Sequence, residues 1–318
     1  MSVLGFDTSN YTTSVAWFDG IAGENCSKLL PVRPGELGLR QSDAVFAHIK
    51  GLPELSGRLF SNHDLSGITA VGVSTRPRAV DGSYMPCFLV GLSHARLLAD
   101  GLHVPLIEVS HQQGHVAAAL WSAGRVDLLD RPHLAWHLSG GTTELLLVEP
   151  EGKNVRCTRI GGTSDISAGQ LIDRTGQLLR LPFPAGKYLD ALSAGAVGTE
   201  TFRVKCPGLE FSLSGVENKV RQFHDAGQNP AETAAFALRC VAGAVLTATR
   251  NARKEYPGLP VVFSGGVASN SLLRRVLAPL EPVFAQPQFS TDNAMGVAVL
   301  ADRLQEGNHA ASSVHYPD

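Results

Sequence analysis

The chain has 318 residues, of which 44% are hydrophobic and 18% are charged, and its formal net charge is −2. A chain of this length suits two hydrophobic cores of about 100 to 200 residues each, and its composition excludes a globally disordered protein. The small net charge and the pI of about 6.6 create no overall field that would attract nucleic acid. We therefore expect a globular protein with two domains.

The N-terminal sequence and the cysteines bear on location in the cell. The chain has no basic N-terminal region and reaches Asp7 after a short apolar run, so we expect neither a secretory signal nor a membrane span. Its five cysteines are odd in number and form no CxxC pair, which argues against a disulfide framework or a zinc ribbon. We expect a protein of the reducing cytoplasm without membrane contact.

Two segments share one pattern. Residues 3–20 read as strand, polar loop, strand and turn, and residues 134–152 repeat that order. Such a loop leaves backbone N–H groups free to bind phosphate, although a single copy would more often be a plain hairpin turn. Because the loop occurs twice, we expect two related lobes, residues 1–130 and 131–318. The candidate phosphate loop of the first lobe contains Asp7, Thr8 and Ser9.

Helical and strand patterns alternate along the remainder of the chain, as layered α/β lobes require. The expected helices cover residues 41–55, 87–100, 110–122, 165–181, 231–255, 270–280 and 293–304. Further strands are expected at residues 65–73 and 259–263. The sequence therefore predicts an α/β protein.

A histidine pair opens the third expected helix. Residues 110–113 have the spacing of a capping box, and His111 and His115 then project from one helical face that can bind a divalent metal. Such a pair also arises by chance among 11 histidines in 318 residues. Gln112 occupies the position at which an HExxH zinc protease needs glutamate, which disfavours a metallopeptidase. Asp292 is the candidate third ligand, and its alternative role is that of a helix N-cap.

Two further segments are candidates for nucleotide binding. Residues 259–270 read as a buried strand that ends in glycines, so the backbone can approach a nucleotide there and Asn270 can bond a ribose or a base edge. A glycine turn that reverses the chain accounts for this pattern equally well. Asp173, on an expected helix before Gly186, can accept ribose hydroxyls, although a lone surface aspartate would look the same.

Taken in order, seven motifs resemble the tRNA N6-adenosine threonylcarbamoyltransferase family, formerly called the glycoprotease or O-sialoglycoprotein endopeptidase family. The resemblance extends from about Val3 to Leu304. Its motifs are GFDTSNYTTS, SHQQGH, LSGGTTEL, DISAGQLIDRTGQLLRLPFPAG, FSLSGVENK, FSGGVASN and STDNA. It implies a two-lobed actin-like ATPase fold, that is, a duplicated ribonuclease H-like fold.

The resemblance also implies ligands and an activity. One divalent ion, iron or zinc, would be held by the residues that match the family's ligands, His111, His115 and Asp292. An adenine nucleotide (threonylcarbamoyl-adenylate, ATP or AMP) would lie against Ser139, Gly140, Gly141, Asp173, Gly186 and Asn270. The implied reaction is attack of an adenosine N6 amine in tRNA on threonylcarbamoyl-adenylate, which expels AMP. No separate catalytic side chain is assigned.

Several charged or glycine-rich parts of the family motifs are replaced, which indicates a divergent paralogue. Tyr11 and Thr12 replace an acidic pair, Glu217 replaces a lysine, and residues 76–82 replace a GPG segment. Two alternatives therefore stay open: a carbamoyltransferase with another acceptor, or a non-catalytic nucleotide-binding regulator or assembly partner. The chain's slight acidity gives tRNA binding little support, so we expect a protein partner or a homo-oligomer.

Overall fold

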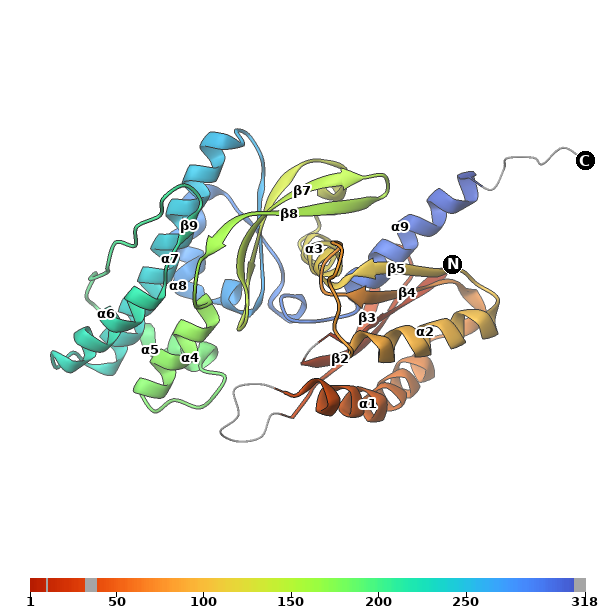
Figure 1. Cartoon of the computed structure of the whole chain (residues 1–318), viewed down its shortest axis with the longest axis horizontal. Helices are drawn as coiled ribbons and strands as arrows, with labels where there is room; N and C mark the ends of the chain where they lie inside the picture. Colours follow the sequence, from red (N-terminus) through yellow and green to blue (C-terminus); the bar gives the residue numbers. More distant parts are fainter. Residues whose placement is uncertain (10, 32–38, 312–318) are drawn as a thin grey trace, which may run out of the picture. The chain divides into compact units, whose positions relative to one another are not determined.

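The computed structural model describes residues 1–9, 11–31 and 39–311 (Figure 1). Two compact units form: the first contains Met1–Arg131, Glu149–Cys157 and a segment that begins at Asp292, and the second contains Pro132–Val148 and Thr158–Thr291. Compared with the expected lobes, 1–130 and 131–318, two later segments are assigned to the first unit. Residues 312–318 of the second expected lobe lie outside the described residues.

The first unit is built on a five-stranded sheet with the order β3-β2-β1-β4-β5. Strands β1, β4 and β5 are parallel, so their carboxyl ends meet at one edge, whereas β2 runs antiparallel to both β1 and β3. The strands are β1 (Ser2–Asp7), β2 (Thr12–Phe18), β3 (Gly23–Leu29), β4 (Ile68–Arg76) and β5 (Leu106–Ser110).

Helices cover both faces of this sheet. Helices α1 (Gln41–Asn62) and α2 (Phe88–Leu102) pack on one face, and α9 (Met295–Ala311) packs on the other beside α3 (His111–Ser122), as Figure 1 shows. The alternation of side chains in β1 explains this division, because Leu4 and Phe6 join the core under α1 and α2. Between them, Gly5 faces α9 so closely that a Cβ would lie 2.6 Å from the Ala294 oxygen.

Two later segments join the first unit through specific contacts. Helix α9 packs against β1 and β4, which brings the C-terminal segment to this sheet. The segment Glu149–Cys157 joins it through a hydrogen bond in which the Gln113 side-chain amide donates to the Val155 oxygen at 2.7 Å. Helix α1 extends to Asn62, beyond the expected end at residue 55, because Leu59 continues its buried face.

The second unit contains a six-stranded sheet with the order β11-β10-β6-β7-β8-β9. Strand β10 runs parallel to β6 and β11, and β7 runs antiparallel to β6. The β6–β7 pair and the β1–β2 pair are therefore both antiparallel hairpins with a polar loop, as the repeated pattern predicts. The strands are β6 (His133–Leu138), β7 (Thr143–Glu151), β8 (Asn154–Thr163), β9 (Glu210–Phe211), β10 (Val261–Ser264) and β11 (Val283–Phe284).

Helix α7 is the central helix of the second unit. In the described part of the chain it alone is long and apolar enough to cross a membrane. However, 72% of its apolar 18-residue stretch is buried, as in a core helix. Residues on α7 pack with α4, α5, α6 and α8. The helices of this unit are α4 (Ala168–Leu178), α5 (Gly186–Ser193), α6 (Ser214–Asp225), α7 (Pro230–Glu255) and α8 (Ser271–Leu277).

Candidate functional site

The first turn of α3 positions the two histidines. Ser110 is the N-cap: its hydroxyl accepts from the Gln113 N–H at 3.3 Å, and the Gln113 side-chain oxygen accepts from the Ser110 N–H at 2.8 Å. This is the capping box that the sequence predicts. His111 and His115 then lie one turn apart on the same face, with ring centroids 4.3 Å apart.

The C-terminal segment brings Asp292 to this pair. Helix α9 approaches α3 so closely at Gly296 that a Cβ there would lie 1.8 Å from the Gly114 oxygen. Only glycine permits this approach. Asn293, and not Asp292, caps the first turn of α9, because the Asn293 side-chain oxygen accepts from the Met295 N–H at 3.0 Å. The Asp292 carboxylate is therefore not used as a helix cap.

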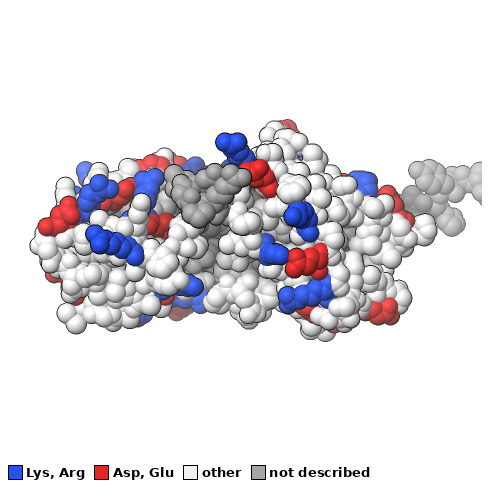
Figure 2. All heavy atoms as spheres, turned by 90° about the horizontal axis from the view of Figure 1, so that it is seen from below, with Lys and Arg blue, Asp and Glu red and all other residues white. Residues whose placement is uncertain are grey.

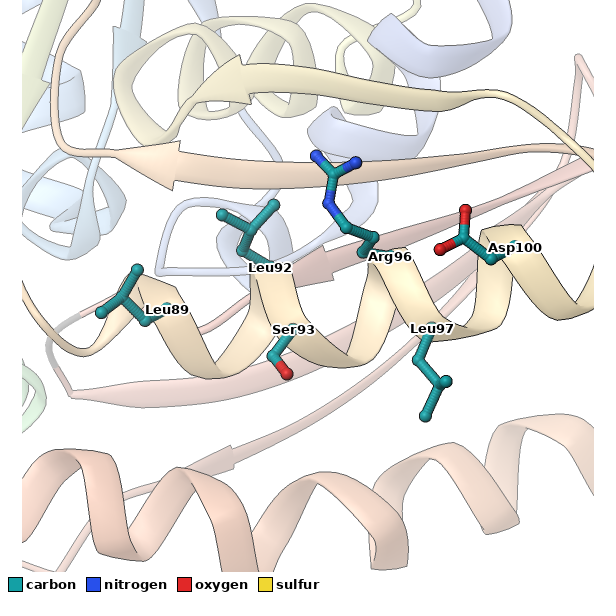
Figure 3. Close-up of a pocket in the computed structure, with 6 residues that line it drawn as sticks. All are labelled: Leu89, Leu92, Ser93, Arg96, Leu97 and Asp100. Carbon is teal, nitrogen blue, oxygen red and sulfur yellow. The ribbon is translucent and has the colours of Figure 1, made fainter.

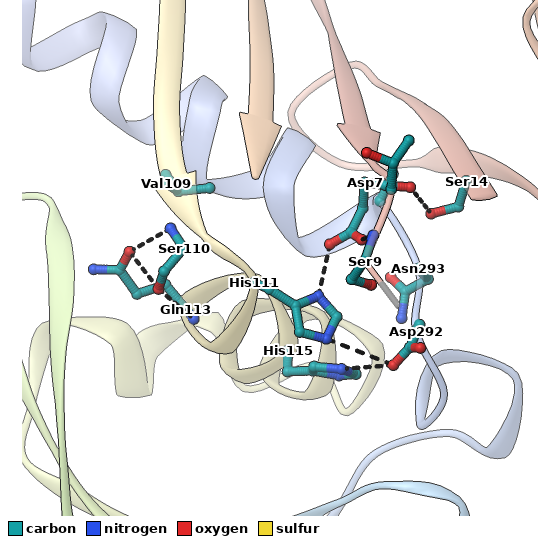
Figure 4. A network of polar contacts seen from close by, with 12 residues as sticks. Asp7, Ser9, Ser14, Val109, Ser110, His111, Gln113, His115, Asp292 and Asn293 are labelled. Atoms are coloured by element: carbon teal, nitrogen blue, oxygen red, sulfur yellow. Dashed lines mark hydrogen bonds and ion pairs between the residues drawn. The ribbon is translucent and has the colours of Figure 1, made fainter. Parts of the chain in front are cut away.

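Three candidate metal ligands converge in Figure 4. The Asp292 Oδ1 atom lies 3.1 Å from His115 Nε2 and 3.6 Å from His111 Nε2. The three candidate ligand atoms lie within 4.8 Å of one another. Two imidazoles and one carboxylate form a set of donors that suits zinc or iron, with positions left for other ligands. These residues fit a divalent metal.

Asp7 lies behind His111, a position that sequence reasoning missed when it assigned Asp7 to a phosphate loop. Its Oδ2 atom lies 2.7 Å from His111 Nδ1, and its Oδ1 atom accepts from the Ser9 N–H at 2.8 Å. A carboxylate that holds one ring nitrogen commonly orients a metal-binding histidine through the other. The available signal was the placement of an aspartate at the carboxyl end of a strand in a parallel sheet.

The remaining residues of the candidate phosphate loop have different surroundings. The Thr8 hydroxyl donates to the Cys87 oxygen at 2.9 Å and accepts from the Gly91 N–H at 3.0 Å, so it fixes β1 to the start of α2. The Ser9 hydroxyl is buried and has no hydrogen-bond partner among the described residues. Of these two hydroxyls, that of Ser9 is the one whose hydrogen-bonding capacity is left for a ligand.

Opposite charges interact within the cluster of Asp7, His111, His115 and Asp292, here called the histidine cluster. Burial alone would lower the pKa of His111, but the Asp7 charge, the hydrogen bond to Asp7 and the Asp292 carboxylate 3.6 Å away outweigh burial and raise it to about 10. Burial would raise the pKa of Asp292, yet the nearby His111 ring and the hydrogen bond with His115 hold it well below its usual range. A protonated His111 therefore lies between two carboxylates, and metal binding to its Nε2 atom must release a proton.

In the second unit, the loop between β6 and β7 contains Ser139, Gly140 and Gly141. The Ser139 hydroxyl accepts from the Thr142 N–H at 3.1 Å, and both glycines are exposed with open space around them. The N-terminus of α4 packs on this loop, where a Cβ on Gly169 would lie 2.4 Å from the Gly140 Cα. The loop is therefore held in place with its backbone accessible.

The end of β10 lies beside this loop because β10 pairs with β6 in parallel. Gly265 has a φ of +91° there, and a Cβ would lie 2.1 Å from the Leu138 oxygen. The Asn270 side-chain oxygen caps α8 by accepting from the Leu273 N–H at 2.9 Å. Its Nδ2 group is buried without a partner among the described residues. A buried amide in this state needs a ligand or water.

Asp173 and Gly186 lie on neighbouring helices of the same unit. The Asp173 carboxylate accepts from the Ala185 N–H at 2.8 Å, so it fixes the turn that leads to Gly186 at the start of α5. Burial raises the pKa of Asp173, and this hydrogen bond offsets part of the rise. Helix α4 also contacts the turn Gly266–Ser269, and α5 contacts α8. These contacts place both residues near the elements that carry Asn270.

A surface hollow on the first unit contains none of these residues. Its volume is about 520 Å³, and Figure 3 shows its lining on α2. Within it, Arg96 pairs with Glu108 at 2.8 Å. The hollow is open and shares no residue with the histidine cluster, so we do not assign the candidate chemistry to it.

The fold defines the class of protein. Full-length HypF in its phosphate- and nucleotide-bound form has a TM-score of 0.58 at 17% identity, over 96% of this chain and 56% of that chain. Component A of Acidaminococcus fermentans (R)-2-hydroxyglutaryl-CoA dehydratase has a TM-score of 0.56 at 14% identity, over 98% and 99% of the two chains. These similarities show the fold alone, and the expected actin-like ATPase fold is confirmed.

Sequence comparison gives the family. The profile of the tRNA N6-adenosine threonylcarbamoyltransferases, TsaD, matches residues 38–299. The enzyme of that name from Streptococcus equi subsp. zooepidemicus is 33% identical over 264 residues, which are 78% of this chain and 74% of the relative. The one from Carboxydothermus hydrogenoformans is 32% identical over 285 residues, 85% and 82% of the two chains. The chain belongs to this family of transferases, as the motifs predict.

Proposed function

We propose that the chain transfers a threonylcarbamoyl group from threonylcarbamoyl-adenylate to the N6 amine of an adenosine in tRNA. The observation that carries this proposal is the convergence of His111, His115 and Asp292, with Asp7 oriented behind His111, in a member of this family. A non-catalytic nucleotide-binding paralogue would have no need for such a coupled set of side chains. A metal-dependent transferase would use it.

His111, His115 and Asp292 would hold one divalent ion, iron or zinc. When bound, the ion would act as a Lewis acid on the carbonyl of the threonylcarbamoyl group. The side chains are prepared for this task by their orientation. The Nδ1 atom of His111 faces Asp7 at 2.7 Å, which leaves its Nε2 atom for the metal. Asp292 is shared between both rings and has no helix-capping role.

The adenylate would bind to the loops of the second unit. Backbone N–H groups in the Ser139–Gly141 loop would bind phosphate, and the Nδ2 group of Asn270 would donate to the ribose or the base. Two observations support this assignment: both glycines have open space around them, and the Asn270 amide is buried without a partner among the described residues. Asp173 would accept from ribose hydroxyls beside Gly186.

In the proposed reaction, the lone pair of the N6 amine attacks the carbamoyl carbon. A new C–N bond forms, the bond from that carbon to the phosphate oxygen breaks, and the electron pair leaves with AMP. The amine loses one proton. The Ser139–Gly141 loop would bind the departing phosphate. We assign the proton to no particular side chain.

We propose weak tRNA binding by the isolated chain. Figure 2 shows basic and acidic side chains interspersed on the face in view. Glu217 lies 2.6 Å from Arg174 and 3.8 Å from Arg221, so it neutralises basic groups of the second unit. Because phosphate contacts dominate tRNA affinity, a protein partner or a second copy would supply further basic groups.

The cytoplasm is the compartment that we propose.

A transfer assay tests this function. The purified full chain, loaded with zinc or iron, is incubated with threonylcarbamoyl-adenylate and tRNA, and the tRNA nucleosides are analysed by mass spectrometry. We expect threonylcarbamoyl-adenosine together with AMP, and neither product from His115→Ala. AMP release without modified tRNA would indicate another acceptor. Nucleotide binding without metal binding or transfer would favour a non-catalytic paralogue.

A further inference from the structure

The connection from β4 to α2 begins at the centre of the sheet edge that carries the histidine cluster. Strand β4 lies between β1 and β5 and is parallel to both. At its carboxyl end, Arg76 pairs in register with Ser110, the residue before His111. Asp7 and His111 thus contact each other across the end of β4. Arg76 therefore leaves the sheet between the two neighbouring strands that position the cluster.

The backbone at this point is irregular and anchored. The register of β4 against β5 shifts between Ser74 and Arg76, and such bulges often redirect side chains beside active sites. Pro77 restricts Arg76 to an extended conformation. The Pro77 oxygen accepts from the Gln112 N–H at 3.0 Å. The start of the connection is therefore fixed to the first turn of α3, which carries His111.

Two polar side chains at this edge have no partner in the part of the chain that the structure describes. Arg76 is exposed, and among the described residues its guanidinium has neither an ion pair nor a hydrogen bond. The acidic residue on neighbouring β5, Glu108, is already paired with Arg96. An exposed arginine alone would be ordinary surface. Ser74 is different, because it is fully buried and its hydroxyl has no partner among the described residues.

Alternation along the strands shows which way Ser74 faces. Gly72 faces α9, where a Cβ would lie 2.7 Å from the Ala301 Cβ. Ser74, two residues later, therefore points to the same side of the sheet. Asp7 stands in the same relation to Gly5, which also faces α9. The unsatisfied hydroxyl of Ser74 is thus directed to the side of the sheet on which Asp7 meets His111.

We propose that Arg76, together with the Ser74 hydroxyl, binds an oxyanion of the ligand held at the histidine cluster. The names of the oxyanions rest on the proposed function: they are the carboxylate of the threonylcarbamoyl group and the phosphate of the adenylate. A guanidinium binds either through paired N–H groups. Arg76 is therefore a specificity-determining residue.

Small probes test the proposal on the zinc-loaded full chain. N-carbamoyl-L-threonine carries the carboxylate, 1-(2-hydroxypropyl)urea lacks it, and inorganic phosphate represents the other oxyanion. Calorimetry should show that the unaltered chain binds carbamoyl-threonine about tenfold more tightly than the urea. A charge-assisted hydrogen bond contributes a binding free energy that corresponds to about this factor. Arg76→Gln should abolish the difference, and Arg76→Lys should retain part of it. Arg78→Gln in the same loop is the matched control.

A second variant separates ligand binding from folding. Ser74→Ala should weaken binding of the same oxyanion without lowering the melting temperature, because the hydroxyl has no partner to lose among the described residues. If Arg76→Gln weakens phosphate and leaves carbamoyl-threonine unchanged, the oxyanion is that of the adenylate. If Arg76→Gln changes the affinity for neither oxyanion, or if neither binds the unaltered chain, the proposal is wrong.

The outcome is distinguishable from that of the proposed function. Oxyanion binding that depends on Arg76, in a chain that modifies no tRNA, would support the binding residue and contradict the transferase activity. Full transfer by Arg76→Gln, with unchanged affinity for both probes, would support the activity and contradict the role of Arg76.

Discussion

The histidine cluster of the first unit and the glycine loops of the second unit are built by different means. The cluster uses side chains from three distant segments, and each is oriented by another: His111 by Asp7, and Asp292 by both histidines. The loops instead expose backbone groups, and small residues such as Gly169 permit their close packing. The first site should therefore be sensitive to the loss of a side chain, and the second to the gain of a Cβ.

The largest effect is expected from removal of a candidate ligand. Asp292→Ala or His115→Ala should lower zinc affinity by at least about 100-fold, because loss of a ligand exceeds the 10- to 100-fold effect of losing its outer partner. Metal content after zinc loading and dialysis measures this. His103→Asn is the control, since His103 is exposed and asparagine tolerates its positive φ of 56°. Equal zinc content in all variants would contradict the site.

A smaller loss is expected when the orienting carboxylate is removed. Asp7→Asn preserves the shape of the side chain but removes the charge that raises the pKa of His111. Zinc affinity should fall by about 10- to 100-fold, as for other outer partners of a ligand. Zinc titration against a competing chelator measures the change. Unchanged affinity would show that Asp7 does not orient His111 for a metal.

Acid should destabilise the first unit through His48. Its Nδ1 atom lies 2.8 Å from the Thr13 hydroxyl, and burial lowers the pKa of His48 to about 4. As pH falls below 6.5, His48 becomes protonated in the unfolded chain, whereas in the folded chain it stays neutral until about pH 4. The stabilisation is complete above pH 6.5 and is lost as pH falls, by up to about 3 kcal/mol.

Denaturant titrations between pH 4 and pH 7 measure how the free energy of unfolding depends on pH. His48→Gln, which has no titrating ring, should show a flatter dependence of the free energy of unfolding on pH than the unaltered chain. The carboxylates that also titrate in this range are common to both proteins. Identical slopes would contradict the assignment of acid sensitivity to His48.

Gain of a methyl group tests the second site. Gly169→Ala should displace the Ser139–Gly141 loop and cost about 1 to 3 kcal/mol in stability, because its Cβ would meet the Gly140 backbone. Affinity for AMP should fall with it. In Gly215→Ala the new Cβ meets nothing within 4 Å, and stability should rise by up to about 1 kcal/mol. Thermal unfolding and AMP calorimetry measure both, and equal behaviour of the two variants would contradict the close-packing account.

Local patterns in the sequence predicted the capping box, the histidine face of α3 and the two hairpin loops. The role of Asp7 could not be found in this way, because its partner His111 lies far along the chain and only the parallel pairing of β1, β4 and β5 brings them together. Asn270 was found as a polar residue after glycines. Only the structure shows that its side-chain oxygen caps α8 while its Nδ2 group has no partner among the described residues.

The position of Asp292 shows the same limit. The family motif predicts that Asp292 is a metal ligand, whereas the local sequence predicts that it is a helix N-cap. Only the structure shows that Asn293 performs the capping. The segment reaches the first unit because Gly296 lets α9 approach Gly114 on α3. Such a long-range contact between small residues leaves little trace in hydrophobic periodicity.

Anomalous X-ray diffraction from crystals of the zinc-loaded chain would locate the metal and identify its ligands. We expect one peak bound by the Nε2 atoms of His111 and His115 and by a carboxylate oxygen of Asp292, each at about 2.0 to 2.2 Å. Asp7 should remain hydrogen-bonded to the Nδ1 atom of His111. A zinc peak held by other residues, with these three side chains still paired to one another, would contradict a metal site at this cluster.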